Sequence, residues 1–141
     1  MMTILVPLDE SDTSEHAAAS AAELARAMNA EVTLVEVVQS PYFSKTKGYR
    51  TLDGDQARTS YPEAWEYLKK ISETVFPNIQ TNLMILEGPV GESLVSLIDD
   101  GAFHMVVMGT EGLGNALKRL LMGSVTKYVL SRAHVPVLVV R

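Results

Sequence analysis

Residues 106–126, VVMGTEGLGNALKRLLMGSVT, decide how this chain folds. The segment begins with an apolar run that stops at Gly109, passes through a loop with further glycines, and ends on Gly123 and Ser124, where a new helix is expected to begin. A strand, a glycine-rich loop and a helix start form, in this order, a common cradle for phosphate, because backbone N–H groups bared by glycine and the first turn of a helix both attract anions. The same glycines can also simply end a strand and separate two helices, with Ser124 as an ordinary helix cap.

The length and composition of the chain narrow the class of protein. Its 141 residues fit a single domain, 1–141, and the absence of cysteine rules out disulfides and thiolate metal sites. A net charge of −5 argues against a general nucleic-acid surface. The chain begins without the basic and apolar segments of a signal peptide, and no apolar run approaches the length of a membrane span. We therefore expect a cytoplasmic protein that binds neither nucleic acid nor membrane.

Apolar and amphipathic segments alternate along the chain. Short aliphatic runs predict five strands, over residues 4–8, 32–38, 83–86, 105–108 and 136–140. Helical periodicity predicts helices that follow Asp12, with Glu15 completing a capping box, and Ser60, with Glu63 in the same role. Further helices are predicted over 92–100, around Leu117, Leu120 and Leu121, and over 125–132. Residues 39–60 show no period and predict a long loop.

This alternation predicts an α/β fold, a doubly wound five-stranded parallel sheet in the order 3-2-1-4-5 with helices on both faces. In that order the first and fourth strands are neighbours, and ligands bind in the crevice at their carboxyl ends. Asp9 follows the first strand and Gly109 ends the fourth. The predicted strand order therefore brings the polar turn at Asp9 and the glycine-rich loop that begins at Gly109 to one site.

Three parts of the sequence resemble the universal stress protein family. They are Pro7-Leu8-Asp9, Glu36-Val37-Val38, and the stretch from Gly109 to Thr126 followed by the closing strand. Nucleotide-binding members of that family carry Gly-x-x-Gly, nine residues, and then Gly-Ser or Gly-Thr. Here Gly112 and Gly123 are separated by ten residues, and counting from Gly114 gives eight. The loop therefore bulges, or Gly114 shares the role of Gly112.

The resemblance implies an adenine nucleotide, ATP or else ADP or AMP, with Mg²⁺ or Mn²⁺ carried by the phosphates. It implies that Pro7 and Asp9 lie against the adenosine, that Val37 offers backbone hydrogen bonds to adenine, and that Met108 and Gly109 form the floor. Phosphates would meet the backbone N–H groups of the motif and the hydroxyls of Ser124 and Thr126. The whole implied nucleotide site comprises Pro7, Leu8, Asp9, Val37, Met108, Gly109, Thr110, Gly112, Gly114, Gly123, Ser124, Val125 and Thr126.

The function expected from the resemblance is that of an ATP-binding regulatory adaptor in a stress response, with an unknown protein partner. No catalytic or metal-ligating set is predicted, so ATP hydrolysis would at most be slow. The resemblance also implies a homodimer joined through Val137–Val140. The alternative is a domain of the same family that binds no nucleotide and acts as a dimeric protein-interaction module. A phospho-receiver domain is disfavoured, because the third strand lacks a terminal aspartate and the chain lacks a lysine after the fifth.

Overall fold

The computed structural model describes residues 1–39, 49–110 and 123–141. In chain order its elements are β1 (Thr3–Pro7), α1 (Asp12–Met28), β2 (Glu31–Val38), β3 (Arg50–Leu52), α2 (Gly54–Ser60), α3 (Pro62–Val75), β4 (Thr81–Glu87), α4 (Val90–Asp100), β5 (Met105–Gly109), α5 (Ser124–Arg132) and β6 (Val137–Val140). The short helix predicted around Leu117, Leu120 and Leu121 falls outside the described residues. In the part of the chain that is described, no helix is long and apolar enough to cross a membrane.

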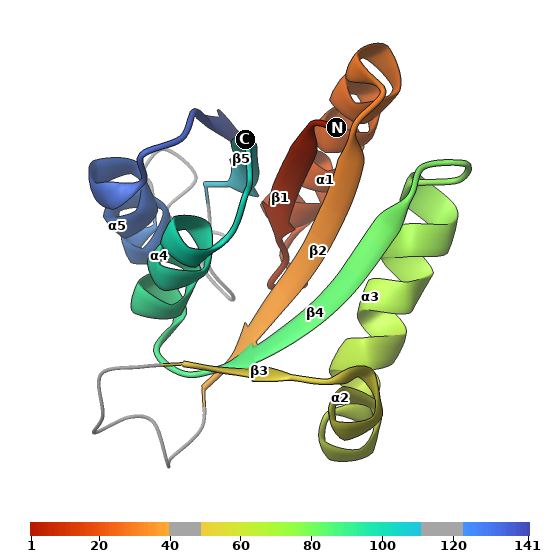
Figure 1. Ribbon diagram of the computed structural model, residues 1–141, viewed down its shortest axis with the longest axis vertical. Helices are drawn as coiled ribbons and strands as arrows, with labels where there is room; N and C mark the ends of the chain where they lie inside the picture. The colour runs from red at the N-terminus through yellow and green to blue at the C-terminus, as the bar shows by residue number, and fades with distance from the viewer. Residues whose placement is uncertain (40–48, 111–122) are drawn as a thin grey trace.

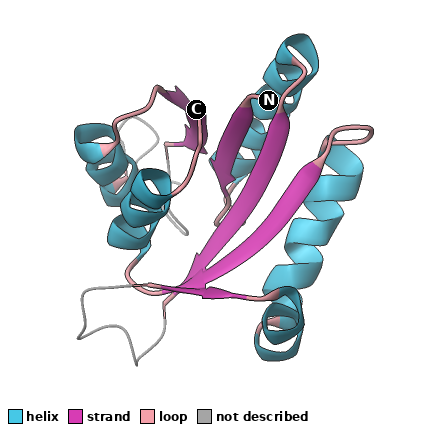
Figure 2. Cartoon of the chain, viewed as in Figure 1, coloured by secondary structure: helices cyan, strands magenta, loops and turns pink. Residues whose placement is uncertain are grey.

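The strands that the structure describes belong to one sheet in the order β3-β4-β2-β1-β5-β6 (Figure 2). The five predicted strands are β1, β2, β4, β5 and β6, and every pairing among them is parallel. Their order is the predicted 3-2-1-4-5. The doubly wound topology is therefore confirmed, and β1 lies between β2 and β5 at the point where the winding reverses direction.

The prediction of only five strands, and of a loop without regular structure over residues 39–60, was wrong. β3 adds a sixth strand, which runs antiparallel along the edge of β4. Helix α2 follows it, and its first turn is closed by a capping box between Asp53 and Gln56. A strand of three residues is too short to show a period, but Asp-x-x-Gln is a sequence signal for a helix start that does not depend on periodicity.

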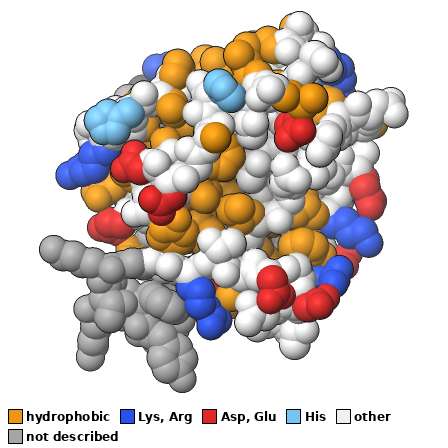
Figure 3. Space-filling view, viewed as in Figure 1, with side chains coloured by type: hydrophobic (Ala, Val, Ile, Leu, Met, Phe, Trp, Pro, Cys, Tyr) orange, Lys and Arg blue, Asp and Glu red, His pale blue; other side chains and the backbone are white. Residues whose placement is uncertain are grey.

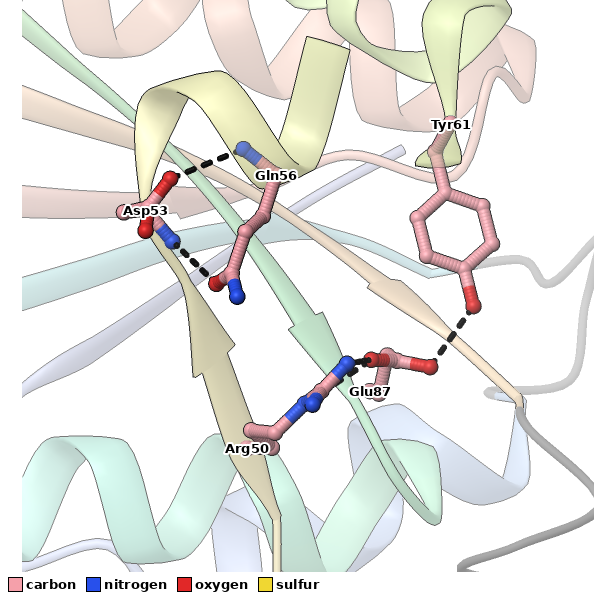
Figure 4. A network of polar contacts seen from close by, with 5 residues as sticks. All are labelled: Arg50, Asp53, Gln56, Tyr61 and Glu87. Atoms are coloured by element: carbon pink, nitrogen blue, oxygen red, sulfur yellow. Dashed lines mark hydrogen bonds and ion pairs between the residues drawn. The ribbon is translucent and has the colours of Figure 1, made fainter. Parts of the chain in front are cut away.

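The buried carboxylate of Glu87 joins β3 and the end of α2 to β4 (Figure 4). Glu87, at the end of β4, accepts hydrogen bonds at its Oε1 from Arg50 Nε at 3.1 Å and Nη2 at 2.5 Å, and at its Oε2 from the Tyr61 hydroxyl at 2.8 Å. Arg50 comes from β3 and Tyr61 from the junction of α2 and α3. One side chain therefore joins three elements at the edge of the sheet.

Helices cover both faces of the sheet, as predicted (Figure 1). α1, α2 and α3 pack on one face and α4 and α5 on the other. Alternate residues along a strand pack against the two helical layers. In β1, Ile4 and Val6 face the layer of α1, α2 and α3, and Leu5 faces the layer of α4 and α5. In Figure 3 hydrophobic side chains gather in the middle of the view, between α4 and the central strands.

Helix α1 approaches the sheet closely because its buried face consists of small residues. Five alanines of this helix are at most 2% exposed: Ala17, Ala18, Ala21, Ala22 and Ala25. Its start was misplaced by one residue, since the N-cap is Ser11, whose side chain accepts a hydrogen bond from Ser14 N, and Asp12 already lies in the first turn. The Ser60 cap of α3 was also wrong: Ser60 ends α2, and Tyr61 precedes Pro62 at the helix start.

Candidate functional site

A cavity of about 420 Å³ opens at the carboxyl ends of β1, β2 and β5, beside the first turn of α5. This is the crevice that the strand order predicted, and its volume lies within the range of small-molecule sites. The described residues that line it are Pro7, Leu8, Asp9, Ser14, Val35, Val37, Gln39, Val90, Leu94, Met108, Gly109, Gly123, Ser124, Val125 and Thr126.

Most of the predicted site residues meet in this lining. Ten of the thirteen are there: Pro7, Leu8, Asp9, Val37, Met108, Gly109, Gly123, Ser124, Val125 and Thr126. Thr110 is buried next to Gly109 and does not line the cavity. Gly112 and Gly114 lie outside the described residues. Three separate stretches of the sequence are thus brought together by the fold, as the predicted topology requires.

The backbone of Thr110 helps to join the end of β5 to the start of α5. The N–H of Gly123 donates a 2.7 Å hydrogen bond to the Thr110 carbonyl. The hydroxyl of Thr126, which was expected to meet phosphate, donates a 2.8 Å hydrogen bond to the carbonyl of Gly109 and is buried. Both of these donors therefore hold the start of α5 against the end of β5.

The first turn of α5 offers the cavity a set of backbone donors. The first N–H groups of an α-helix have no partner within the helix, and here they belong to Ser124, Val125 and Thr126. The N-cap residue is Gly123, which supplies no side-chain cap. Uncapped N–H groups and the positive end of the helix dipole both favour an anion at this end of the cavity.

Asp9, in the turn after β1, also lines the cavity. Its Oδ1 accepts a 3.0 Å hydrogen bond from Ser11 N, and its own N–H lies 3.5 Å from Ser14 Oγ. The N–H of Leu8 donates to Val35 O at 2.8 Å, which extends the pairing of β1 and β2 by one residue. Asp9 is thus held in a fixed turn while its side chain borders the cavity.

Five lining residues were not predicted: Ser14, Val35, Gln39, Val90 and Leu94. A period of two along β2 would have found Val35, because it shares a face with Val37. Leu94 lies in the helix that the sequence predicts over residues 92–100, and Val90 lies one turn earlier on the same side. The aliphatic side chains among them form an apolar wall, so the cavity combines an apolar surface with backbone donors that favour an anion.

The described lining offers little to a metal ion. Its one carboxylate is Asp9, whose Oδ1 already accepts a hydrogen bond. Among residues 1–39, 49–110 and 123–141, no group of three or more histidine, aspartate or glutamate side chains is arranged to hold a metal.

A buried carboxyl lies beside the cavity, behind the strand that forms its apolar wall. Glu36 is only 8% exposed and alternates with Val35 and Val37, so its side chain projects from the opposite face of β2. Burial raises its pKa from 4.5 to about 7, and the charges of Glu10 and Asp9 add to the shift. The sequence placed Glu36 at the end of a strand, but nothing in it indicated a buried carboxyl.

Comparison with known proteins agrees with this architecture. The family model for the universal stress protein family matches residues 1–141. The universal stress protein MJ0531 of Methanocaldococcus jannaschii is 35% identical to this chain over 140 residues, which are 98% of this chain and 81% of that protein.

Solved structures share the fold. The structure of MJ0577 from Methanocaldococcus jannaschii is similar with a TM-score of 0.79 and 26% identity, covering 99% of this chain and 94% of that one. A universal stress protein in complex with cAMP is similar with a TM-score of 0.69 and 24% identity, covering 99% and 96%. With a family model that spans every residue and a relative at 35% identity, this chain belongs to the universal stress protein family.

Proposed function

We propose that this protein binds ATP and acts as a nucleotide-dependent regulatory adaptor in a stress response, with slow ATP hydrolysis at most. The observation that carries the proposal is the uncapped start of α5, which lines the same cavity as the aliphatic wall from β2 and α4. A phosphate chain needs the first feature and a nucleobase the second. The cytoplasmic location expected from the sequence is part of the same proposal.

The bound nucleotide would lie across the cavity from β2 to α5. The adenine ring would pack between Val35 and Val37 on one side and Met108 on the other, with its edge against the backbone of Val37. The ribose would lie near Pro7 and Asp9, where the turn after β1 presents a carboxylate. The phosphates would accept hydrogen bonds from the first turn of α5.

The remaining motif residues would complete the phosphate end. Gly112 and Gly114 would add backbone donors, and Thr110, Leu8 and Gly109 would shape the wall behind them. Ser124 is exposed at the rim of the cavity, so its hydroxyl is free to turn toward a phosphate. The cAMP complex of a family member supports the choice of an adenine nucleotide.

Mg²⁺ or Mn²⁺ would be held by the phosphates of the nucleotide rather than by the protein. This follows from the donor set, in which Asp9 is the one carboxylate of the described lining. Magnesium is commonly bound in this way, through substrate phosphates and few carboxylates. Fast phosphoryl transfer would also require a group that orients the attacking water, and the described lining offers one carboxylate, Asp9.

Two copies of the chain would pair through Val137–Val140. β6 is the last strand on its side of the sheet, and Leu138 on it is 40% exposed. An unpaired edge strand with an exposed leucine favours association. If the cavity held no nucleotide, this edge would support the alternative function of a dimeric protein-interaction module.

The test is isothermal titration of nucleotide-free protein with ATP and Mg²⁺, comparing the wild type with Gly123→Val and Gly54→Val. The valine at 123 would place a branched side chain beside the α5 donors and is expected to weaken binding by about tenfold or more. Gly54 begins α2, away from the cavity, and its variant is the matched control. Equal affinity of the wild type and Gly123→Val would refute the site, and absence of ATP binding by folded wild type would refute the function.

A further inference from the structure

Most polar side chains of the cavity are already hydrogen-bonded within the protein. The Thr126 hydroxyl, the Ser14 hydroxyl and the Asp9 carboxylate each make a hydrogen bond to a nearby backbone group. The two other polar side chains of the described lining are those of Ser124 and Gln39, and neither makes a hydrogen bond to another described residue. Both are exposed at the rim, so both are available to a ligand.

These two side chains lie on different sides of β1. Ser124 begins α5, which follows β5, whereas Gln39 directly follows β2, and β1 lies between β2 and β5 in the sheet. Ser124 is therefore on the side where the helix start favours an anion, and Gln39 is on the side of the aliphatic wall. An amide on that side would meet the base of a nucleotide rather than its phosphates.

Gln39 continues the face of β2 that lines the cavity. Val35, Val37 and Gln39 follow one another at intervals of two residues, which is the spacing of side chains on one face of an extended chain, and all three line the cavity. Two residues of a strand advance by about 7 Å, which is the order of the width of a purine ring system. The aliphatic wall thus ends in a carboxamide close to where the edge of a stacked base would lie.

The backbone of Val37 is unpaired on the side of β1. Pairing of β1 with β2 reaches Pro7 and Val35, and the N–H of Leu8 adds one bond to Val35 O. Alternate residues of a strand direct their N–H and C=O groups toward the same neighbour, so those of Val37 point past the end of β1, where no described backbone group meets them. One donor and one acceptor match the N1 and amine groups of adenine.

We propose that the carboxamide of Gln39 reads the second polar edge of adenine and so selects adenine over guanine. This inference rests on the proposed function. With N1 of the base toward Val37, the edge formed by N7 and the amine is left for the next lining residue of β2. The amide oxygen accepts the second amine hydrogen and the amide N–H donates to N7, a bidentate pairing that glutamine makes with adenine in DNA. Guanine presents two acceptors on that edge, so the amide oxygen would face an acceptor.

The test is isothermal titration of the wild type, Gln39→Leu and Gln80→Leu with ATP and with 7-deaza-ATP, which lacks the N7 acceptor. The wild type should bind 7-deaza-ATP about fivefold more weakly than ATP, because one hydrogen bond is lost. Gln39→Leu should bind the two nucleotides equally. Gln80 is exposed, precedes β4 and does not line the cavity, so Gln80→Leu is the matched control and should keep the wild-type ratio.

The ratio of the two affinities isolates the contact with N7. A general loosening of the cavity weakens both nucleotides alike, and any property of 7-deaza-ATP itself is the same for all three proteins. Titration with GTP extends the test to the choice of base: the preference of the wild type for ATP over GTP should narrow severalfold in Gln39→Leu and persist in Gln80→Leu.

A second measurement uses only the wild type and its nucleotides. The side-chain amide signal of Gln39 in nitrogen-15 NMR, assigned by its loss in Gln39→Leu, should shift on saturation with ATP and shift less with 7-deaza-ATP. Equal affinity ratios in the wild type and Gln39→Leu, or a Gln39 amide signal that ATP leaves in place, would overturn the reading of the base and leave the proposed function intact. Absence of ATP binding by the folded wild type would overturn both.

Discussion

The hydroxyl of Thr126 donates a 2.8 Å hydrogen bond to the carbonyl oxygen of Gly109, joining the start of α5 to the end of β5 across the whole glycine segment. The neighbouring bond from Gly123 N to Thr110 O, at 2.7 Å, ties the same two points through the backbone. Together they set the direction in which the first turn of α5 points. The position of the first turn of α5 at the cavity therefore depends on contacts between residues that are far apart in the sequence.

Replacing Thr126 with valine tests this contact. Valine has nearly the same shape but no hydroxyl, so the Gly109 carbonyl loses its buried donor, and we expect the free energy of unfolding to fall by about 1–3 kcal/mol. Thr126→Ser keeps the donor and should cost less. Urea unfolding of the three proteins provides the measurement. If the valine variant unfolds at the same urea concentration as the wild type, the bond does not hold the segment.

Gly109 is expected to tolerate no larger residue. A Cβ at this position would lie 2.6 Å from the carbonyl carbon of Thr13 and 2.7 Å from the nitrogen of Ser14, both in the backbone of α1. Helix α1 would have to move, so Gly109→Ala should lower the free energy of unfolding by about 1–3 kcal/mol and weaken ATP binding.

The matched control for this substitution is Gly54→Ala. The nearest contact of a Cβ there is the Trp65 ring at 4.0 Å, an ordinary packing distance. Thermal unfolding of both variants should show a lower melting temperature for Gly109→Ala alone. A melting temperature unchanged from the wild type in both would mean that α1 adjusts its position without cost.

Stability should fall as the pH rises through the titration of Glu36. Its pKa is about 7 in the folded protein against 4.5 when exposed, so the folded state binds more protons between these values. The neutral carboxyl stabilises the fold fully below about pH 4.5, and this contribution is lost as the pH rises through about 7. The full loss corresponds to about 3 kcal/mol.

Urea unfolding at several pH values measures this loss. Glu36→Gln cannot ionise and should lack this part of the pH dependence, so it should exceed the wild type in stability above the folded-state pKa. Glu73→Gln, an exposed change on α3, should keep the wild-type profile. Parallel profiles for the wild type and Glu36→Gln would show that the folded and unfolded states hold the Glu36 proton equally.

The proposed dimer is tested at the edge of β6. Leu138→Lys puts a charge on the strand that would pair with its copy, and we expect it to shift the protein from dimer to monomer in light scattering at micromolar concentration. Leu130→Lys is the matched control, because Leu130 on α5 is 39% exposed against 40% for Leu138. A wild type that is already monomeric would count against pairing through Val137–Val140.

The sequence alone determined the order of the parallel strands and the place of the crevice. Both follow from local information: runs of aliphatic residues, helical periods between them, and the handedness of each strand–helix–strand connection. The glycines and serine that end one strand and begin one helix are also local signals, which is why ten of the predicted site residues meet in the cavity.

Tertiary structure decided what happens between residues that are distant in the sequence. The burial of Glu36 depends on how α1 and α3 pack over β2, and the contact of Tyr61 and Arg50 with Glu87 depends on a three-residue strand at the edge of the sheet. The use of the Gly123 and Thr126 donors depends on where α5 meets β5. The periodic spacing of apolar residues in the sequence shows which face of a helix or strand is apolar. It does not record which polar atoms will meet once the elements are packed, because that is set by the three-dimensional arrangement of the whole domain.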